Sequence, residues 1–316
     1  MTAAPDVAVH WELGSDRPRE DHGFFGPDSP TWKVWTSPTA LIGFQRSVVL
    51  EHFEPHLAAA VADAAGIYRD PRGRMDGTLA YFLIIATADS RTAVEASEHL
   101  QKVHARSKGL DPVTGTRYSA NDPASQLWIH VTGWHSVLKC YEVFGPGPLS
   151  RAEEDRYWSE CVIAAELQTV NPADVPRSRD EVRQYFARMR PTLCTSERAQ
   201  RAMHYLLRTP RSGSSNMQFW AISRLLAPAT IATLPRWMRE LGQFDQPGIV
   251  DAAYRPLVSA GTRIAGIPAV ETTILRRSLP MTRTALRDFH KAKAPLRPVT
   301  VTPAEAKERY GRRATA

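Results

Sequence analysis

RMDGTLAYFLIIATADS, at residues 74–90, decides the fold class of this chain. Its apolar run from Leu79 to Ala88 predicts an element that is buried on all sides, either a helix or, less favoured, a strand. The run is too short to cross a bilayer, so we expect no transmembrane segment. If the element is a helix, Arg74 and Thr78 are one turn apart and share a face of it.

Two further segments follow, and each contains a histidine. EHLQKVHARSKGLDPVTGTRYSANDP, at residues 98–123, places His104 four residues after Leu100, on the apolar side of a helix. ASQLWIHVTGWHSVL, at residues 124–138, contains His130 and is too apolar for a surface helix. Buried imidazoles near a guanidinium and a hydroxyl are able to hold an iron centre. The spacing alone favours the alternative, in which both are core histidines whose ring nitrogens bond within the protein.

Start and stop signals of helices recur along the chain, whereas apolar residues with a period of two are almost absent. We therefore predict one large all-α domain over residues 31–291, with an irregular N-terminal arm at 1–30 and a loose, disordered tail at 292–316. The signals are Ser90 with Gly109 as start and C-cap, Asp122-Pro123 as N-cap and first helical residue, and the capping-box pairs Ser150 with Glu153 and Ser178 with Glu181. Later helices are expected near 195–208, 215–226, 231–241, 247–264 and 281–292.

Composition is that of a folded protein from a reducing compartment. Aliphatic and aromatic residues make up 43% of the 316 residues, enough for a sizeable core. The 3 cysteines have no CxxC spacing, which argues against a disulfide framework or a zinc site. The first 21 residues lack the basic start and apolar centre of a secretory signal, so we expect a cytoplasmic location. GxGxxG, P-loop and GxSxG motifs are absent, which disfavours nicotinamide enzymes and hydrolases.

The net charge of +7 comes from the C-terminal end of the chain. Residues 272–316 contain 11 Lys/Arg and 3 acidic residues, so the rest of the chain is close to neutral. A basic, Pro-rich tail is able to attract phosphates weakly, but a solvated terminus is the favoured interpretation. No nucleic-acid-binding motif is present, and a nucleic-acid partner is disfavoured.

Each candidate residue has a functional and a structural interpretation. His104 is either an axial ligand of haem iron or a core residue. His130 is either a proton donor or second ligand, or part of the core with the tryptophans around it. Arg74 suits a haem propionate or another anion, or it pairs with an acid such as Asp76. The Thr78 hydroxyl is able to bond to iron-bound oxygen.

His52 and His56 are spaced for a shared helix face, as in zinc peptidases. Pro55 interrupts the helix between them, and the glutamate spacing of HExxH is missing. No Glu-x-x-His pair occurs, which argues against a carboxylate di-iron bundle. We therefore disfavour a metal at this pair. His135, on another face of its helix from His130, is interpreted as structural.

Taken together, these segments resemble the MpaB-type oxygenase family, which includes the catalytic domain of the rubber oxygenases (latex-clearing proteins). The likeness covers roughly residues 31–265. It rests on Trp32 and Gly43-x-x-Arg46, DPRGRMDGTLAY at 70–81, KVHARSKGLDPVTGTRYSANDP at 102–123, LWIHVTG at 127–133, YEVFGPGPLSRAEEDRYW at 141–158 and ATIATLPRWMRELG at 229–242.

The resemblance implies an all-helical fold, globin-like in the rubber oxygenases, around haem b. His104 matches the proximal haem ligand of the family, and Arg74 and Thr78 match the distal arginine and threonine of the rubber oxygenases. Relatives use dioxygen to cleave an alkene bond in rubber or in a prenyl chain. The implied partners are therefore dioxygen and a small organic substrate.

Three departures from the family pattern bear on the reaction. Gly77 stands where rubber oxygenases have a lysine that ligates the distal side, so that side is either open or served by His130. Glu54 precedes Pro55 where many relatives have histidine. No export signal is visible, which disfavours polyisoprene as the substrate.

The sequence thus predicts a haem b oxygenase that activates dioxygen or peroxide on a small, largely apolar substrate, with a role in secondary metabolism. His104 is the expected proximal ligand, and Arg74, Thr78 and His130 are the expected catalytic residues. The alternative is a non-catalytic helical protein that binds haem or an apolar ligand in the same cavity. A third, weaker hypothesis is nucleic-acid binding through the basic tail.

Overall fold

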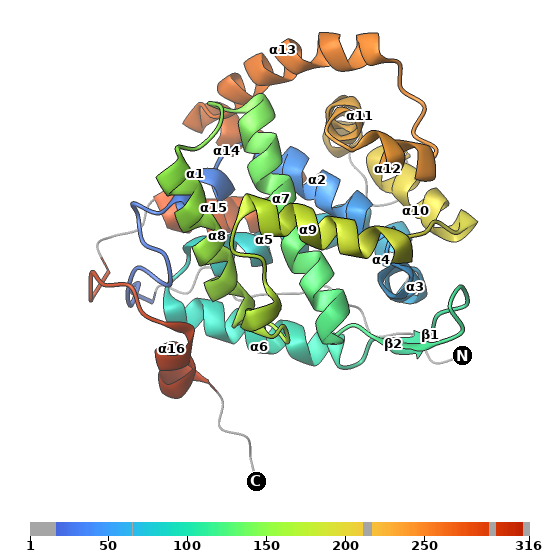
Figure 1. Ribbon diagram of the computed structural model, residues 1–316. Helices are drawn as coiled ribbons and strands as arrows, with labels where there is room; N and C mark the ends of the chain where they lie inside the picture. Colours follow the sequence, from blue (N-terminus) through green and yellow to red (C-terminus); the bar gives the residue numbers. More distant parts are fainter. Residues whose placement is uncertain (1–16, 65, 211–216, 291–294, 312–316) are drawn as a thin grey trace.

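The computed structural model describes residues 17–64, 66–210, 217–290 and 295–311, and within them the chain is one all-α domain (Figure 1). Apart from two short 3₁₀ helices and one two-stranded hairpin, the described regular structure is α-helical. The α-helices are α1 (Pro30–Trp35), α2 (Ala40–Glu51), α3 (Pro55–Ala64), α4 (Gly66–Arg69), α5 (Pro71–Thr87), α6 (Ser90–His104), α7 (Pro123–Phe144), α8 (Arg151–Ala165), α9 (Arg179–Met189), α10 (Glu197–Leu207), α11 (Met217–Ala232), α12 (Arg236–Leu241), α13 (Gly248–Ala265), α14 (Pro268–Ser278), α15 (Pro280–His290) and α16 (Pro303–Tyr310). The 3₁₀ helices are Pro172–Asp174 and Arg190–Thr192.

The apolar run at 79–88 is helical, as the favoured interpretation predicted. α5 begins at an Asp70 N-cap, whose carboxylate accepts a hydrogen bond from the Gly73 amide at 2.9 Å, and Pro71 occupies the first helical position. Every residue from Leu79 to Thr87 is buried. A helix that is apolar all round has to be covered on all sides, and α1, α4, α6 and α15 pack against α5.

α2 and α7 form the closest helix pair of the core. Gly43 makes this crossing possible, because a β carbon added to it would lie 2.6 Å from the Val137 Cα atom. α7 begins where the sequence predicted, with the Asp122 side chain accepting hydrogen bonds from the amides of Ala124 and Ser125. In Figure 1 α7 runs through the middle of the molecule, with α2 beside it.

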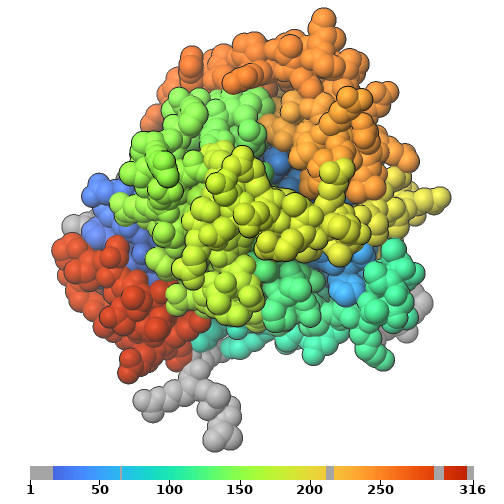
Figure 2. Space-filling model, in the orientation of Figure 1, coloured from blue at the N-terminus to red at the C-terminus, as the bar shows by residue number. Residues whose placement is uncertain are grey.

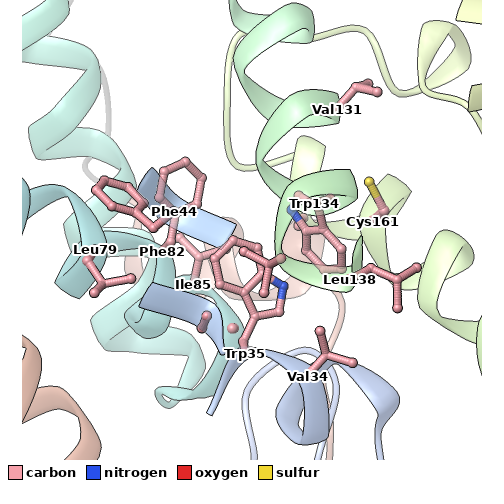
Figure 3. Packing of buried hydrophobic residues seen from close by; sticks show 14 of the residues in the cluster. Val34, Trp35, Phe44, Leu79, Phe82, Ile85, Val131, Trp134, Leu138 and Cys161 are labelled. Carbon is pink, nitrogen blue, oxygen red and sulfur yellow. The ribbon is translucent and has the colours of Figure 1, made fainter. Parts of the chain in front are cut away.

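Aromatic rings join the N-terminal helices to this pair. Trp35 of α1 stacks on Phe82 of α5 with ring centroids 5.5 Å apart, and it meets Trp134 of α7 edge-on at 5.6 Å. Figure 3 shows these rings together with Phe44 of α2 and Leu79. The stretches that decided the fold class in the sequence therefore meet in one core.

Predicted helix boundaries hold at the capping signals and fail where a hairpin intervenes. The Ser150–Glu153 capping box is complete, whereas at Ser178 only the bond from the Glu181 amide to the serine hydroxyl forms. The expected C-cap at Gly109 is wrong. α6 ends at His104, and residues 108–110 form β1 of an antiparallel hairpin with β2 at 117–119.

Residues 295–311 pack against the rest of the domain, so the expectation of a disordered tail is wrong for this part of the chain. The Val301 amide donates to Gly23 O at 3.0 Å, and the Leu296 amide donates to Arg19 O at 2.9 Å. α16 has a complete capping box at Thr302 and packs on α6, with Ala306 buried. Figure 2 shows this segment (red) on the surface beside the N-terminal segment (blue). Expected tail residues 292–294 and 312–316 lie outside the described residues.

Among the described residues, none of the helices has the length and apolar character needed to cross a membrane. α5 and α7 are apolar because they are central helices of the core.

Candidate functional site

Arg74 and Thr78 lie on one face of α5, one turn apart, as the sequence predicted. The Thr78 hydroxyl donates to the Arg74 carbonyl at 2.8 Å, so its lone pairs remain able to accept a hydrogen bond. The half-buried Arg74 guanidinium makes no hydrogen bond with another described residue. Gly66 lies beside it, and a β carbon there would make an ordinary van der Waals contact with Arg74 Nη1, at 3.5 Å.

Glu51, the last residue of α2, is the acidic partner of Arg74, and the sequence interpretation missed it as a site residue. Burial raises the pKa of Glu51 to about 7, while the nearby Arg74 guanidinium opposes the rise. Burial lowers the pKa of Arg74, and the Glu51 carboxylate opposes that shift in turn. Glu51 is therefore able to hold or release a proton near neutral pH. Its signal in the sequence was an acid directly after the apolar run VVL of residues 48–50.

His104 is the last residue of α6 and faces the same arginine. Burial, and then the Arg74 guanidinium, lower the pKa of His104 to about 4, so the imidazole is neutral at pH 7. Gln126 Nε2 lies 3.4 Å from His104 Nδ1 and donates to Ala120 O at 2.6 Å. The Nε2 atom of His104 has no hydrogen-bond partner among the described residues. The effect of the Arg74 charge on the imidazole thus places Arg74 near His104.

His52 is a second buried imidazole near Arg74. The sequence suggested it only as a metal ligand together with His56, and that interpretation was disfavoured. Its Nδ1 atom bonds to Val48 O at 2.7 Å, and its buried Nε2 atom has no partner. Burial is the main cause that lowers the pKa of His52 to about 4. A cavity of about 20 Å³ adjoins the ring and is also lined by Asp111 and Cys194. That volume is enough for about one water molecule.

His56 does not complete a metal site with His52. Its Nε2 atom lies 2.8 Å from Thr116 Oγ1, and its Nδ1 atom lies 4.0 Å from Glu54 Oε1. Over the described ranges, no group of three or more His, Cys, Asp or Glu side chains is arranged to hold a metal ion. A haem site differs from such a cluster, because a single histidine suffices to ligate haem iron.

His130 lies at another place, in the contact between α7 and α8. Its Nε2 atom bonds to Cys161 O at 2.7 Å, and Gln168 Nε2 lies 3.3 Å from its Nδ1 atom. The ring is fully buried and packs against Trp134, and burial lowers its pKa to about 4. Both ring nitrogens have partners within the core. This is what the second interpretation of His130, as part of the core, predicted. The contacts of His130 therefore give no support to its expected role as proton donor or second ligand.

His135 lies on a different face of α7, near Arg46, whose Nη1 atom is 3.3 Å from His135 Nδ1. Its ring packs on Phe186 of α9, and burial, followed by Arg46, lowers its pKa well below the usual value. These contacts agree with the structural role expected for it.

We call Glu51, Arg74, Thr78 and His104 the Arg74 cluster. These residues form a site that combines three chemical groups. It offers a neutral imidazole whose Nε2 atom has no hydrogen-bond partner among the described residues, a cation that likewise has no hydrogen-bonded partner there, and a carboxyl group that titrates near neutrality. An imidazole ligand and a guanidinium are the groups that iron and the propionates of a haem require. The donor set therefore fits a haem.

Comparison with known proteins gives one match that covers most of the chain. A sequence model described as "ER-bound oxygenase mpaB/B'/Rubber oxygenase, catalytic domain" matches residues 32–264, which include the whole Arg74 cluster. No curated protein and no solved structure matches the chain significantly.

Proposed function

Because the chain belongs to the family of MpaB-type and rubber oxygenase catalytic domains, we propose that it is a haem b-dependent oxygenase acting on a small, largely apolar substrate. The observation that carries the cofactor assignment is the free Nε2 atom of His104, on a neutral imidazole beside an arginine without a hydrogen-bonded partner. Haem bound at this position would supply an iron that activates dioxygen or peroxide.

His104 would hold the iron through Nε2, and Gln126 would fix the orientation of the ring. Gln126 now donates towards Nδ1, which leaves the proton of the neutral ring on Nε2. Ligation requires the other tautomer, with the proton on Nδ1. A half-turn of the Gln126 amide would present its oxygen to that proton, at the expense of its hydrogen bond to Ala120 O.

Arg74 and Thr78 would order the anionic and polar groups that enter the site. The guanidinium offers several N–H donors to a propionate or another anion. The Thr78 oxygen is held by its bond to the Arg74 carbonyl, so its accepting lone pairs have a fixed position. Gly77 has no side chain, so the adjacent position of α5 offers no ligand of its own.

Glu51, rather than His130, would hold the proton that such a reaction transfers. Its pKa of about 7 lies near the operating pH, which is the condition for effective general acid–base catalysis. The charge of Arg74 beside it favours the carboxylate form, so an anion bound to Arg74 would raise the proton affinity of Glu51.

The proposal is tested by the absorption spectrum of protein purified from haem-supplied cells, before and after dithionite and carbon monoxide. We expect a Soret band near one haem per chain that shifts with carbon monoxide. The His104→Ala variant should lose this band and keep its helical circular dichroism, whereas His130→Gln should keep both.

A His104→Ala variant with an unchanged haem spectrum would refute the ligand assignment. A wild-type protein that forms no Soret band after haem reconstitution would refute the cofactor. Haem binding without substrate-dependent oxygen consumption would support the alternative, a non-catalytic haem-binding protein.

A further inference from the structure

The side of α13 that faces away from the core is apolar and exposed. Ile249, Leu257 and Ile264 of this helix are 78%, 57% and 58% exposed. Helical spacing places them within about 80° of one another around the helix axis, on the side away from Val258, the only residue of α13 that is buried. Three further exposed apolar residues complete this outer face of α13: Ala253, Pro256 and Ala260.

α11 and the turn after α13 extend this apolar surface. Leu225 of α11 is 53% exposed, and it lines the same apolar cavity of about 320 Å³ as Leu257, so the exposed sides of the two helices meet at this cavity. Ile267, just beyond α13, is 50% exposed. In Figure 1 α13 runs along the edge of the molecule, and Figure 2 shows this part of the chain (orange) at the surface. Exposed apolar side chains gathered on one surface mark a contact with a protein or a membrane.

The exposed charge on the three helices around this surface is entirely positive. Two acidic residues occur on these helices, and both are half-buried: Asp251 pairs with Arg239 at 2.8 Å, and Glu271 lines the cavity. An anionic partner therefore complements the surface. The exposed arginines of α11, α13 and α14 are Arg224, Arg255, Arg263, Arg276 and Arg277.

We propose that the outer face of α13, Leu225, Ile267 and these arginines form a docking surface for a membrane that contains anionic lipids. α13 would lie parallel to the bilayer, with its outer face against the acyl chains and the guanidinium groups among the lipid phosphates. A bilayer is planar, and a helix at the edge of the molecule is able to meet it along its length (Figure 1).

A second copy of the chain is a poorer partner for the docking surface. Two such surfaces would bring the same positive charges face to face, and like charges across an interface are unfavourable. The proposal goes beyond the proposed oxygenase function, since the docking surface contains neither His104 nor any other residue of the Arg74 cluster.

The experiment is co-sedimentation of the full chain with vesicles of phosphatidylcholine, with and without phosphatidylglycerol. We expect the wild type to bind the anionic vesicles at least about tenfold more tightly than the neutral ones, and to lose this preference at high salt. Ile249→Ser/Ile264→Ser should weaken binding by more than about tenfold, because two side chains no longer leave water. The matched control is Leu110→Ser/Val113→Ser, since these hairpin residues are 61% and 50% exposed and lie far from α13 in Figure 1.

The contribution of charge is tested with a second pair of variants. Arg224→Gln/Arg263→Gln should weaken binding to the anionic vesicles by about tenfold and leave binding to the neutral ones unchanged. Lys108→Gln/Arg117→Gln removes the same charge from exposed positions of the hairpin and should have little effect. Equal effects of the two double variants would show that the arginines of the docking surface have no special role, and the anionic partner would be wrong.

A fluorescent label reports which side of the molecule meets the lipid, without removal of a large apolar side chain. An environment-sensitive maleimide dye on Ala260→Cys should shift to the blue with anionic vesicles, and the same dye on Val113→Cys should not. Wild type treated with the dye corrects for reaction at Cys194, which is half-buried. This measurement remains decisive if the isoleucine variant fails to show the circular dichroism of the wild type.

A wild type that ignores anionic vesicles would overturn the proposal, as would equal binding of the isoleucine and hairpin variants or a blue shift of the dye at the hairpin alone. A dimer that Ile249→Ser/Ile264→Ser abolishes, in a protein that does not bind vesicles, would assign the surface to a second copy. His104→Ala should bind vesicles like the wild type, so a failure of the haem assignment and a failure of this surface give different results.

Discussion

His130 makes a testable contribution to the pH dependence of stability, because it is neutral and fully buried in the folded protein. Its pKa in the fold is about 4, against an ordinary value of 6.5. Between these values the unfolded chain binds a proton that the folded chain does not bind. The stabilisation is therefore complete above pH 6.5, and it is lost as the pH falls towards 4. From pH 7 to pH 5 the loss from this one residue is roughly 2 kcal/mol.

The measurement is urea unfolding followed by circular dichroism at pH 7 and pH 5, for the wild type and His130→Gln. Glutamine does not titrate, so the loss of unfolding free energy between the two pH values should be smaller in the variant by roughly 2 kcal/mol. His52, His104 and His135 are present in both proteins, so their contributions cancel in the comparison. Equal losses in the two proteins would show that His130 is not held neutral by burial, and the core interpretation of this residue would be wrong.

Two further predictions concern packing. Gly43→Ala should destabilise the protein by about 1–3 kcal/mol in thermal unfolding, because its methyl group would meet Val137 at 2.6 Å. The control is Gly133→Ala, whose β carbon would lie 3.7 Å from its nearest neighbour. It should be neutral or stabilising by up to about 1 kcal/mol. Similar losses of unfolding free energy in the two variants would refute the close crossing of α2 and α7. Ala306→Asp should lower the unfolding free energy by about 1–3 kcal/mol, because it places a carboxylate under α16, whereas exposed Ala304→Asp should not. Equal stability of these two variants would indicate that α16 is not docked on α6.

Much of the fold could be predicted from the sequence, because local signals and burial agree there. The apolar run after Arg74 has no polar face, so it predicted a fully buried element, with a helix favoured over a strand. The Asp122 and Ser150 caps fix the starts of α7 and α8. The hairpin at 108–119 could not be predicted, since its strands are three residues each and carry no alternating pattern. The sequence analysis did not predict α14, because the charged residues Arg276 and Arg277 in its last turn interrupt its apolar pattern.

The site was predictable only in part, for a different reason. Spacing along α5 determines that Arg74 and Thr78 share a face, and the family resemblance selects His104. Whether a buried imidazole is free or satisfied depends on residues far away in the sequence, such as Cys161 and Gln168 beside His130. Glu51 acquires its raised pKa from the burial around α2, which no local pattern reveals.

The pairing of residues 19–23 with 296–301 has a consequence for synthesis of the chain. The two segments are separated by more than 270 residues. The N-terminal segment bonds early to residues 87–90, where Arg19 donates to Thr87 O and Asp21 accepts from Ser90, but residues 296–301 reach it only when almost all of the chain has left the ribosome. Helices α2, α5 and α7 are complete much earlier and can associate while translation continues. The final step of folding is then closure of a very long loop, which costs little more entropy than a shorter one but has to wait for the last residues. A ribosome that stops shortly before residue 296 would hold a helical core whose first segment is bonded to residues 87–90 but still lacks residues 296–301.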